Sequence, residues 1–267
     1  MAEKQRYFIE LAYDGTNYHG WQVQPNAVTV QELLDKALST VLRGPVETVG
    51  CGRTDTGVHA KQFFAHFESR SIVDGPWSMA DPAKAMDYGL WAIYHKLINS
   101  LNAILPKDIA IKRIIPVHTE AHARFDATLR SYEYHIHFEK DPFRLNRSWE
   151  LRDKPDIALM NEAAKIMMEY TDFSCFSKSN TQTFTNNCKI SGAGWTEHES
   201  GMVFRISADR FLRNMVRAIV GTLIPIGFKE MEPEGIMAII DSKNRSNAGT
   251  SVPACALYLT EVKYPYL

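Results

Sequence analysis

One short segment combines residue types that could carry out nucleophilic or acid–base chemistry. It runs from Gly50 to Ala60 and places three glycines around Asp55, with Arg53 two residues earlier. Glycines permit a tight turn whose backbone can approach a ligand closely, so Asp55 could act as nucleophile or general base, and Arg53 could bind a phosphate or displace a base. An aspartate here could also close an Asx-turn in a surface loop, which local chemistry alone favours.

A second segment, from Asp209 to Val220, is rich in arginine. Its apolar residues recur at helical spacing and predict a stripe that faces the core. The polar positions on the other side fall three or four apart and carry Arg210, Arg213, Asn214 and Arg217. Guanidinium groups match phosphate oxygens bidentately, so the row predicts a phosphate-binding helix, with a solvated basic face as the alternative. A buried member of the row could instead pair with Asp55 and keep it ionised.

The third segment runs from Ala123 to Tyr132. Tyr132 could stack on an unpaired base, a contact that is worth ~1–3 kcal/mol per base in other systems. However, the aromatic and apolar residues from Tyr132 to Phe138 alternate with polar ones and predict a strand. A core tyrosine is therefore the simpler interpretation from the residues alone.

The sequence predicts no metal site. His118 and His122 lack the glutamate that a zincin motif requires, and His135 and His137 have no evident third ligand. The four cysteines are scattered without a Cys-x-x-Cys pair, which favours reduced thiols and a cytoplasmic protein. No signal peptide and no run of about 18 apolar residues is present, so we expect no membrane association.

The overall charge gives no support for a nucleic-acid partner. The chain has 30 Lys and Arg residues against 31 Asp and Glu residues, for a formal net charge of -1. Binding to phosphates depends on local rather than total positive charge. An RNA-binding function therefore requires the basic residues to gather on one face.

The elements that must position these residues follow from periodicity and capping signals. In the first half, strands are predicted at 7–13, 46–49, 62–67 and 109–115, and helices at 30–44 and 92–104. Residues 29–32 form a capping-box sequence, and residues 71–89 are typical of a loop or insertion. In the second half, strands are predicted at 131–138, 189–197, 202–208 and 257–262, with helices capped by Asp156 and Asp209.

Both halves thus have the order β-α-β-β-α-β of ferredoxin-like and RRM-like domains. We predict an α+β fold of two such halves, residues 1–118 and 119–267, the first with the Asp55 loop and the second with Tyr132 and the arginine row. Their mostly antiparallel sheets are expected to abut, with helices on one face and an active-site cleft between the halves.

Taken together, these segments resemble the tRNA pseudouridine synthase A family over most of the chain. The segments that carry the resemblance are 13–24, 52–60, 124–132, 172–178, 211–221 and 245–259. The most specific is Gly52-Arg-Thr-Asp-Thr-Gly-Val-His-Ala60, which resembles the family's catalytic loop. Two features depart from the pattern: Ala256 stands where the family normally has glycine, and residues 71–97 are longer than is typical. The resemblance favours the functional interpretation of all three segments.

The resemblance implies conversion of uridine to pseudouridine at positions 38, 39 and 40 of the tRNA anticodon arm, by a homodimer, without metal or organic cofactor. It implies that Asp55 is the nucleophile, that Tyr132 stacks on the target base and that Arg217 pairs with Asp55. Arg53 would help to displace the base, which must leave the helical stack before it can react. The residues expected to bind substrate are Arg53, Thr54, Gly57, His59, Arg124, Arg130, Arg210, Arg213 and Asn214.

Three alternatives stay open at this point. A non-catalytic RNA-binding module would explain the fold pattern and the arginine row, but it leaves the Asp55 loop without a purpose, and the RNA-recognition strand signature is absent. A hydrolase or nucleotidyl transferase with Asp55 as base would normally need a metal, so activity in a chelator would exclude it. A pseudouridine synthase that acts elsewhere on tRNA is separated only by mapping the product.

Overall fold

The computed structural model describes residues 5–70, 72, 90–178 and 184–267. The chain divides into two compact units: Met1–Thr56 with Ala60–Ala127, and Gly57–His59 with Thr128–Leu267. Each unit combines helices with a mostly antiparallel sheet, so the fold is α+β as the sequence predicts. The sequence-based division at residues 118 and 119 stays a prediction.

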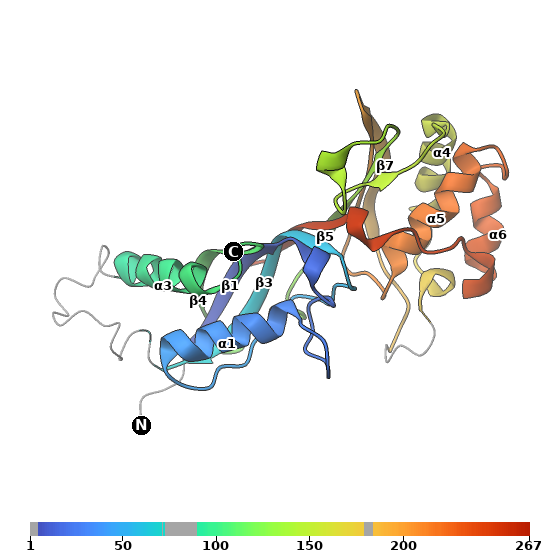
Figure 1. The fold of residues 1–267 in the computed structure, drawn as a ribbon. Helices are drawn as coiled ribbons and strands as arrows, with labels where there is room; N and C mark the ends of the chain where they lie inside the picture. Colours follow the sequence, from blue (N-terminus) through green and yellow to red (C-terminus); the bar gives the residue numbers. More distant parts are fainter. Residues whose placement is uncertain (1–4, 71, 73–89, 179–183) are drawn as a thin grey trace. The chain divides into compact units, whose positions relative to one another are not determined.

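The first unit is built on three long antiparallel strands. The central strand is β1 (Gln5–Tyr13), which pairs with β3 (His59–Ser69) on one side and β4 (Ile109–Val117) on the other. A short strand, β2 (Val49–Gly50), pairs with the far side of β3. The strand order is therefore β4-β1-β3-β2. The helices α1 (Val30–Leu42) and α3 (Leu90–Ile104) lie beside these strands in Figure 1.

The predicted capping box starts α1. The side-chain oxygen of Thr29 accepts a hydrogen bond from the backbone N–H of Glu32, and Arg43 ends the helix in the left-handed region at φ 56°. The fully buried Leu34 and Leu38 lie on the helix's apolar face. The amphipathic pattern thus predicts both the start and the buried face of this helix.

The second unit contains four antiparallel strands that pair with one another. Its order is β9 (Leu257–Lys263), β5 (Leu129–His137), β8 (Gly201–Ala208) and β7 (Ile190–His198). A short strand, β6 (Trp149–Glu150), runs parallel to β5. The helices are α4 (Ile157–Met167), α5 (Met215–Gly227) and α6 (Gly235–Asp241), which are drawn together beside β7 in Figure 1.

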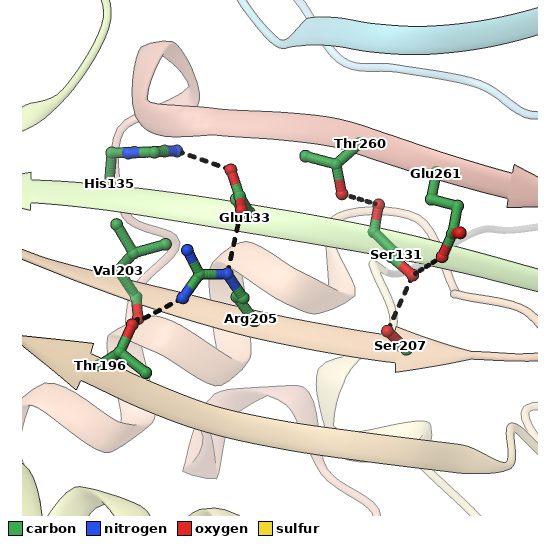
Figure 2. A network of polar contacts seen from close by, with 9 residues as sticks. All are labelled: Ser131, Glu133, His135, Thr196, Val203, Arg205, Ser207, Thr260 and Glu261. Carbon is green, nitrogen blue, oxygen red and sulfur yellow. Dashed lines mark hydrogen bonds and ion pairs between the residues drawn. The ribbon is translucent and has the colours of Figure 1, made fainter.

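The strand β5 has two chemically different faces, as its alternation predicts. Tyr134 and Ile136 are buried in the core that this unit's helices share, and Tyr132 packs against that core. The alternate residues project from the other face into the polar network of Figure 2. There Glu133 accepts hydrogen bonds from Arg205 Nε at 3.0 Å and from His135 Nε2 at 3.1 Å. Side chains on this face of β5 make polar contacts with one another, whereas side chains on the opposite face pack in the apolar core.

Hydroxyl groups extend the same network across neighbouring strands. The Ser131 hydroxyl lies 2.8 Å from that of Ser207 on β8 and donates to the Glu261 carboxylate on β9 at 3.2 Å. The Thr260 hydroxyl donates to the Ser131 carbonyl at 3.1 Å (Figure 2). Cross-strand pairs of this kind hold β5 in register between β8 and β9.

Most predicted strands and helices agree with the structure apart from a few residues at their ends, but the start of the arginine-rich helix was predicted wrongly. α5 begins at Met215 rather than after Asp209, because Asn214 adopts the left-handed region at φ 66°. The Asp209 carboxylate instead accepts hydrogen bonds from the backbone N–H groups of Lys189 at 2.8 Å and Arg210 at 2.7 Å. The predicted polar row is therefore not a helical face, and of its members only Arg217 lies in α5.

Three smaller differences concern strands, helices and the predicted insertion. The strand predicted at 46–49 is reduced to Val49–Gly50, because the backbone N–H groups of Val46 and Thr48 donate to side chains of α1 rather than to a strand. The short elements β6 and α6 were not predicted. Most of the loop predicted at 71–89 lies outside the described residues.

The contact between α1 and Thr48 gives a testable pH dependence of stability. The Asp35 carboxylate accepts hydrogen bonds from the Thr48 backbone N–H at 3.0 Å and the Thr48 hydroxyl at 2.6 Å. Burial, only partly offset by these bonds, raises the pKa of Asp35 to about 6. The folded state therefore binds more protons than the unfolded state between the ordinary pKa and pH 6, and this group's contribution to stability falls as pH rises through that window.

Asp35→Asn should remove this contribution, because the amide oxygen still accepts from Thr48 and the amide does not ionise. As the pH rises from 4.5 to 7, we expect the free energy of unfolding of the variant to increase relative to that of the parent. The increase should be on the order of 1 kcal/mol, discounted for the carboxyl's partial exposure. Urea unfolding of both proteins across this range measures the difference. Comparison with the parent is essential, since burial lowers the pKa of His66 to about 4, which changes stability in the opposite direction. A difference independent of pH would contradict the prediction.

Candidate active site

The glycine-flanked loop around Asp55 leaves the first unit's sheet directly after β2. The backbone N–H of Cys51 donates to the Phe64 carbonyl on β3 at 2.7 Å, and the Cys51 side chain is fully buried. Asp55 is half-buried and Arg53 is exposed. The loop is thus anchored in the core at its start, and Arg53 and Asp55, the residues that the sequence singles out, are at least partly accessible.

A second segment, residues 13–24, fixes the far part of this loop. The Tyr13 hydroxyl lies 2.9 Å from the Thr54 hydroxyl, and the Trp21 backbone N–H donates to the Thr54 carbonyl at 3.4 Å. Gly20 has φ +85°, and a Cβ atom on it would lie 2.2 Å from the Thr54 carbonyl oxygen. Only glycine therefore permits this approach. Three contacts converge on Thr54, the residue directly before Asp55.

The indole of Trp21 supports the start of the same loop. Its ring stacks on Phe63 with centroids 4.1 Å apart, and a Cβ atom on Gly50 would lie 2.5 Å from its Nε1. Sequence reasoning did not assign positioning roles to Tyr13, Gly20 or Trp21. The only signal available was that they lie in one of the segments that carry the family resemblance.

Three residues shortly after Asp55, Gly57–His59, belong to the second unit. Gly57 has φ +80°, which suits glycine. His59 is 2% exposed, and its Nε2 lies 3.0 Å from the Asn146 carbonyl and 2.9 Å from the Cys255 carbonyl. Carbonyl oxygens only accept, so Nε2 carries the proton. The ring also stacks on Tyr258 at 4.5 Å. The structure gives His59 a structural role that ties two loops of this unit together.

Tyr132 lies on β5 with its ring against the helical core. It is half-buried, and the Phe211 ring meets it edge-to-face at 5.1 Å and 87°. Its neighbour Arg130 is 8% exposed and donates to the Asp209 carbonyl at 2.9 Å. Phe211 thus fixes the position of the Tyr132 ring. The Arg130 guanidinium is bonded to the protein's own backbone.

Arg217 is held where two of the sequence motifs meet. Its Nε donates to the Val252 carbonyl at 2.7 Å, and the Val252 N–H donates back to the Arg217 carbonyl at 3.4 Å. One turn further along α5, Gly221 approaches the Thr250 backbone so closely that a Cβ atom would lie 1.8 Å from its carbonyl oxygen. Segments 211–221 and 245–259 thus pack closely against each other, and this contact sets the position of Arg217.

The remaining predicted substrate-binding residues differ in exposure. Those that are exposed are Arg53, Arg124 and Arg213, and those that are half-buried are Thr54, Gly57, Arg210 and Asn214. The Asn214 side-chain amide donates to the Ser251 hydroxyl. Asp55 lies in the first unit, and Tyr132 and Arg217 lie in the second.

Within residues 5–70, 72, 90–178 and 184–267, no three His, Cys, Asp or Glu side chains come together in a way that could hold a metal ion. In the same part of the chain, no helix has both the length and the apolar character needed to cross a bilayer.

Comparison with known proteins identifies the class and then the family. Residues 163–265 match a family model described as tRNA pseudouridine synthase. The chain is 48% identical to a tRNA pseudouridine synthase A of Parabacteroides distasonis, over 98% of this chain and 96% of that protein. It is also 48% identical to one of Bacteroides thetaiotaomicron (98% and 91%) and 34% identical to one of Clostridium acetobutylicum (96% and 98%).

These matches define an isomerase of the pseudouridine synthase class. Within that class, the chain belongs to the tRNA pseudouridine synthase A family. The resemblance inferred from the sequence is thus confirmed. Family membership favours an enzyme over the non-catalytic RNA-binding module and over the metal-dependent hydrolase considered above.

Proposed function

We propose that this enzyme converts uridine to pseudouridine at positions 38, 39 and 40 of the tRNA anticodon stem-loop, with Asp55 as nucleophile. The observation that carries the proposal is the construction of the Asp55 loop. Three contacts, from Tyr13, Gly20 and Trp21, hold the residue directly before the carboxylate. Such positioning is what a reacting group needs, since small displacements from productive geometry reduce rates steeply.

The reaction rearranges bonds within one nucleotide. The bond from uracil N1 to the ribose C1′ breaks, the base turns while it is held, and a bond from C5 to C1′ forms. The proton on C5 is lost and N1 gains a proton, so atoms and charge balance without a co-reactant. We propose that the target base leaves the helical stack to reach Asp55, since neither C1′ nor C6 is accessible in a paired base.

The other site residues receive roles that fit their surroundings. The ring of Tyr132, fixed by Phe211, provides a flat apolar surface on which the displaced base can stack. Arg53, which is exposed, takes the place of the base in the stack. Arg217 pairs with Asp55 and places a guanidinium group beside its carboxylate.

For tRNA binding we propose the arginines that reach solvent together with the loop residues around them. The assigned residues are Arg53, Thr54, Gly57, Arg124, Arg210, Arg213 and Asn214. In this proposal they supply the local positive charge that tRNA binding requires in a chain of net charge -1. His59 and Arg130 contribute to this site by fixing its loops, since both are buried and hydrogen-bonded to backbone carbonyls.

The strand orders support a finer description of the fold. We propose that each unit is a ferredoxin-like half, because the orders β4-β1-β3-β2 and β9-β5-β8-β7 are the same permutation of a β-α-β-β-α-β chain. We further propose that the enzyme is a cytoplasmic homodimer that needs no metal, in which both copies contact one tRNA.

Pseudouridine mapping tests the proposed function directly. The substrate is an unmodified tRNA with uridines at 38 to 40, incubated with the enzyme in excess chelator. Product at these positions supports both the site specificity and the independence from metal. Product only at other positions would indicate a different specificity within the class, and loss of all product on chelation would indicate a metal requirement.

Arg217→Ala is expected to reduce kcat by about 100-fold, because the substitution removes the cation proposed to pair with Asp55. It should also lower the midpoint of thermal unfolding, since the Val252 carbonyl loses its donor. Arg217→Lys keeps the charge but not the guanidinium geometry. Its kcat and unfolding midpoint should lie between those of the parent and of Arg217→Ala. Single-turnover rates and thermal unfolding measure both effects. A fully active and equally stable Arg217→Ala variant would show that the proposed ion pair is wrong.

A further inference from the structure

A turn in the first unit, residues 118–127, is fixed by contacts with two strands. The Ala123 backbone N–H donates to Nδ1 of His66 on β3 at 3.0 Å, and the Arg6 guanidinium on β1 donates to the Ala121 carbonyl at 3.0 Å. Ala121 and Ala123 are fully buried. The backbone of this turn is therefore held in one conformation from the side of the sheet.

His122 organises the exposed part of the same turn. Its backbone N–H donates to the Asp126 carboxylate at 2.7 Å. Its Nδ1 accepts hydrogen bonds from the backbone N–H groups of Arg124 at 3.1 Å and Phe125 at 3.3 Å. Both acceptor roles require an unprotonated Nδ1 on His66 and His122, and burial lowers the pKa of each ring. The turn is thus fixed at neutral pH.

This fixed turn presents one aromatic ring to solvent. Phe125 is 74% exposed, its ring lies 4.3 Å from the His122 ring, and the Arg124 guanidinium carbon lies 5.7 Å from its centroid. Exposing a large apolar ring on an ordered turn gives up the free energy of its burial. An aromatic ring with a guanidinium beside it is the combination that proteins use to stack single-stranded bases and to neutralise their phosphates.

We propose that Phe125 is a stacking platform for an unpaired base of the tRNA substrate, with Arg124 at an adjacent phosphate and His122 supporting the ring. This inference rests on the proposed tRNA substrate and extends it to a contact that adds affinity rather than chemistry. His66 acts as a positioning residue, because its acceptor nitrogen holds the turn. The proposal assigns tRNA binding to the start of segment 124–132, which contains Phe125.

Phe125→Ala should raise the dissociation constant for unmodified tRNA about tenfold, a loss of affinity within the range measured for stacked bases. KM should rise to a similar extent while kcat at saturating tRNA stays unchanged. Phe125→Trp should restore binding, because an indole also stacks, whereas Phe125→Leu should not. Phe143→Ala is the matched control, since Phe143 is 88% exposed and lies in the other unit. Thermal unfolding should be the same for all of these variants.

The outcomes separate this inference from the proposed function. A Phe125→Ala variant whose tRNA affinity stays within twofold of the parent would overturn the inference, as would a shift to a smaller species in sedimentation, which would place Phe125 at a contact between protein copies. If the parent makes no pseudouridine at 38 to 40 but Phe125→Ala still weakens tRNA binding, the proposed positions fail and the stacking platform stands.

Discussion

Asp55→Asn is expected to reduce pseudouridine formation by at least about 1,000-fold, while the dissociation constant for tRNA stays within several-fold of the parent. The amide matches the carboxylate in shape but cannot serve as a nucleophile. The loop should keep its conformation, because its anchors act on the Cys51 and Thr54 backbones and on the Thr54 hydroxyl. The expected loss is thus confined to the chemical step.

Single-turnover mapping with the enzyme in saturating excess over tRNA measures the chemical step, and filter binding in parallel measures the dissociation constant. Asp153→Asn is a suitable control, since Asp153 is exposed and lies in the other unit. Appreciable turnover by Asp55→Asn would assign the nucleophile to another residue. A parallel collapse of tRNA binding would instead show that Asp55 acts mainly in substrate recognition.

Local signals in the sequence were sufficient where the structure depends on neighbours along the chain. The Thr29 capping box predicts the start of α1, and the alternation in β5 predicts which residues enter the core. The Asp156 signal likewise holds, since its carboxylate accepts from the backbone N–H groups of Ala158 and Leu159. For the two caps the bonded N–H groups lie within three residues, and for β5 the two-residue period alone separates the two faces.

The start of α5 could not be predicted because its cause is distant in the sequence. Asp209 has the residue type of a helix cap, but its carboxylate bonds to the backbone of Lys189, 20 residues earlier. Phe211 and Leu212 still pack with the core, so the apolar pattern continues through a turn that is not helical. Hydrophobic periodicity indicates which residues are buried, and here Leu212, which is buried, and Phe211, which is partly buried, lie outside the helix.

The support of the Asp55 loop was also beyond local reasoning. Sequence alone identifies Asp55 as the residue of interest but leaves open whether its loop is a surface turn or a positioned site. The decision depends on Tyr13, Gly20 and Trp21, which are more than 30 residues away and contact Thr54 only through the tertiary fold. Tertiary contact, rather than composition, distinguishes the two interpretations.

Gly20→Ala should therefore impair catalysis although Gly20 has no chemistry of its own. The added methyl would lie 2.2 Å from the Thr54 carbonyl oxygen, and the residue already adopts φ +85°. Because the contact is with backbone, relief requires the loop before Asp55 to move. A displacement near 1 Å can cost about 100-fold in rate, so we expect kcat to fall by roughly that factor while the affinity for tRNA changes little.

Gly44→Ala provides the control for the glycine-to-alanine change itself. Gly44 follows α1 in the same unit, and a Cβ atom placed on it meets nothing within 4 Å, so this variant should keep parental activity. Both variants are assayed below their unfolding temperatures, because strain at Gly20 should also lower stability by ~1–3 kcal/mol. If folded Gly20→Ala retains the parental kcat, the Thr54 backbone does not control the position of Asp55. A loss confined to Gly20→Ala would mean that the segment from Tyr13 to Gln24 acts in catalysis by holding the backbone next to the Asp55 carboxylate.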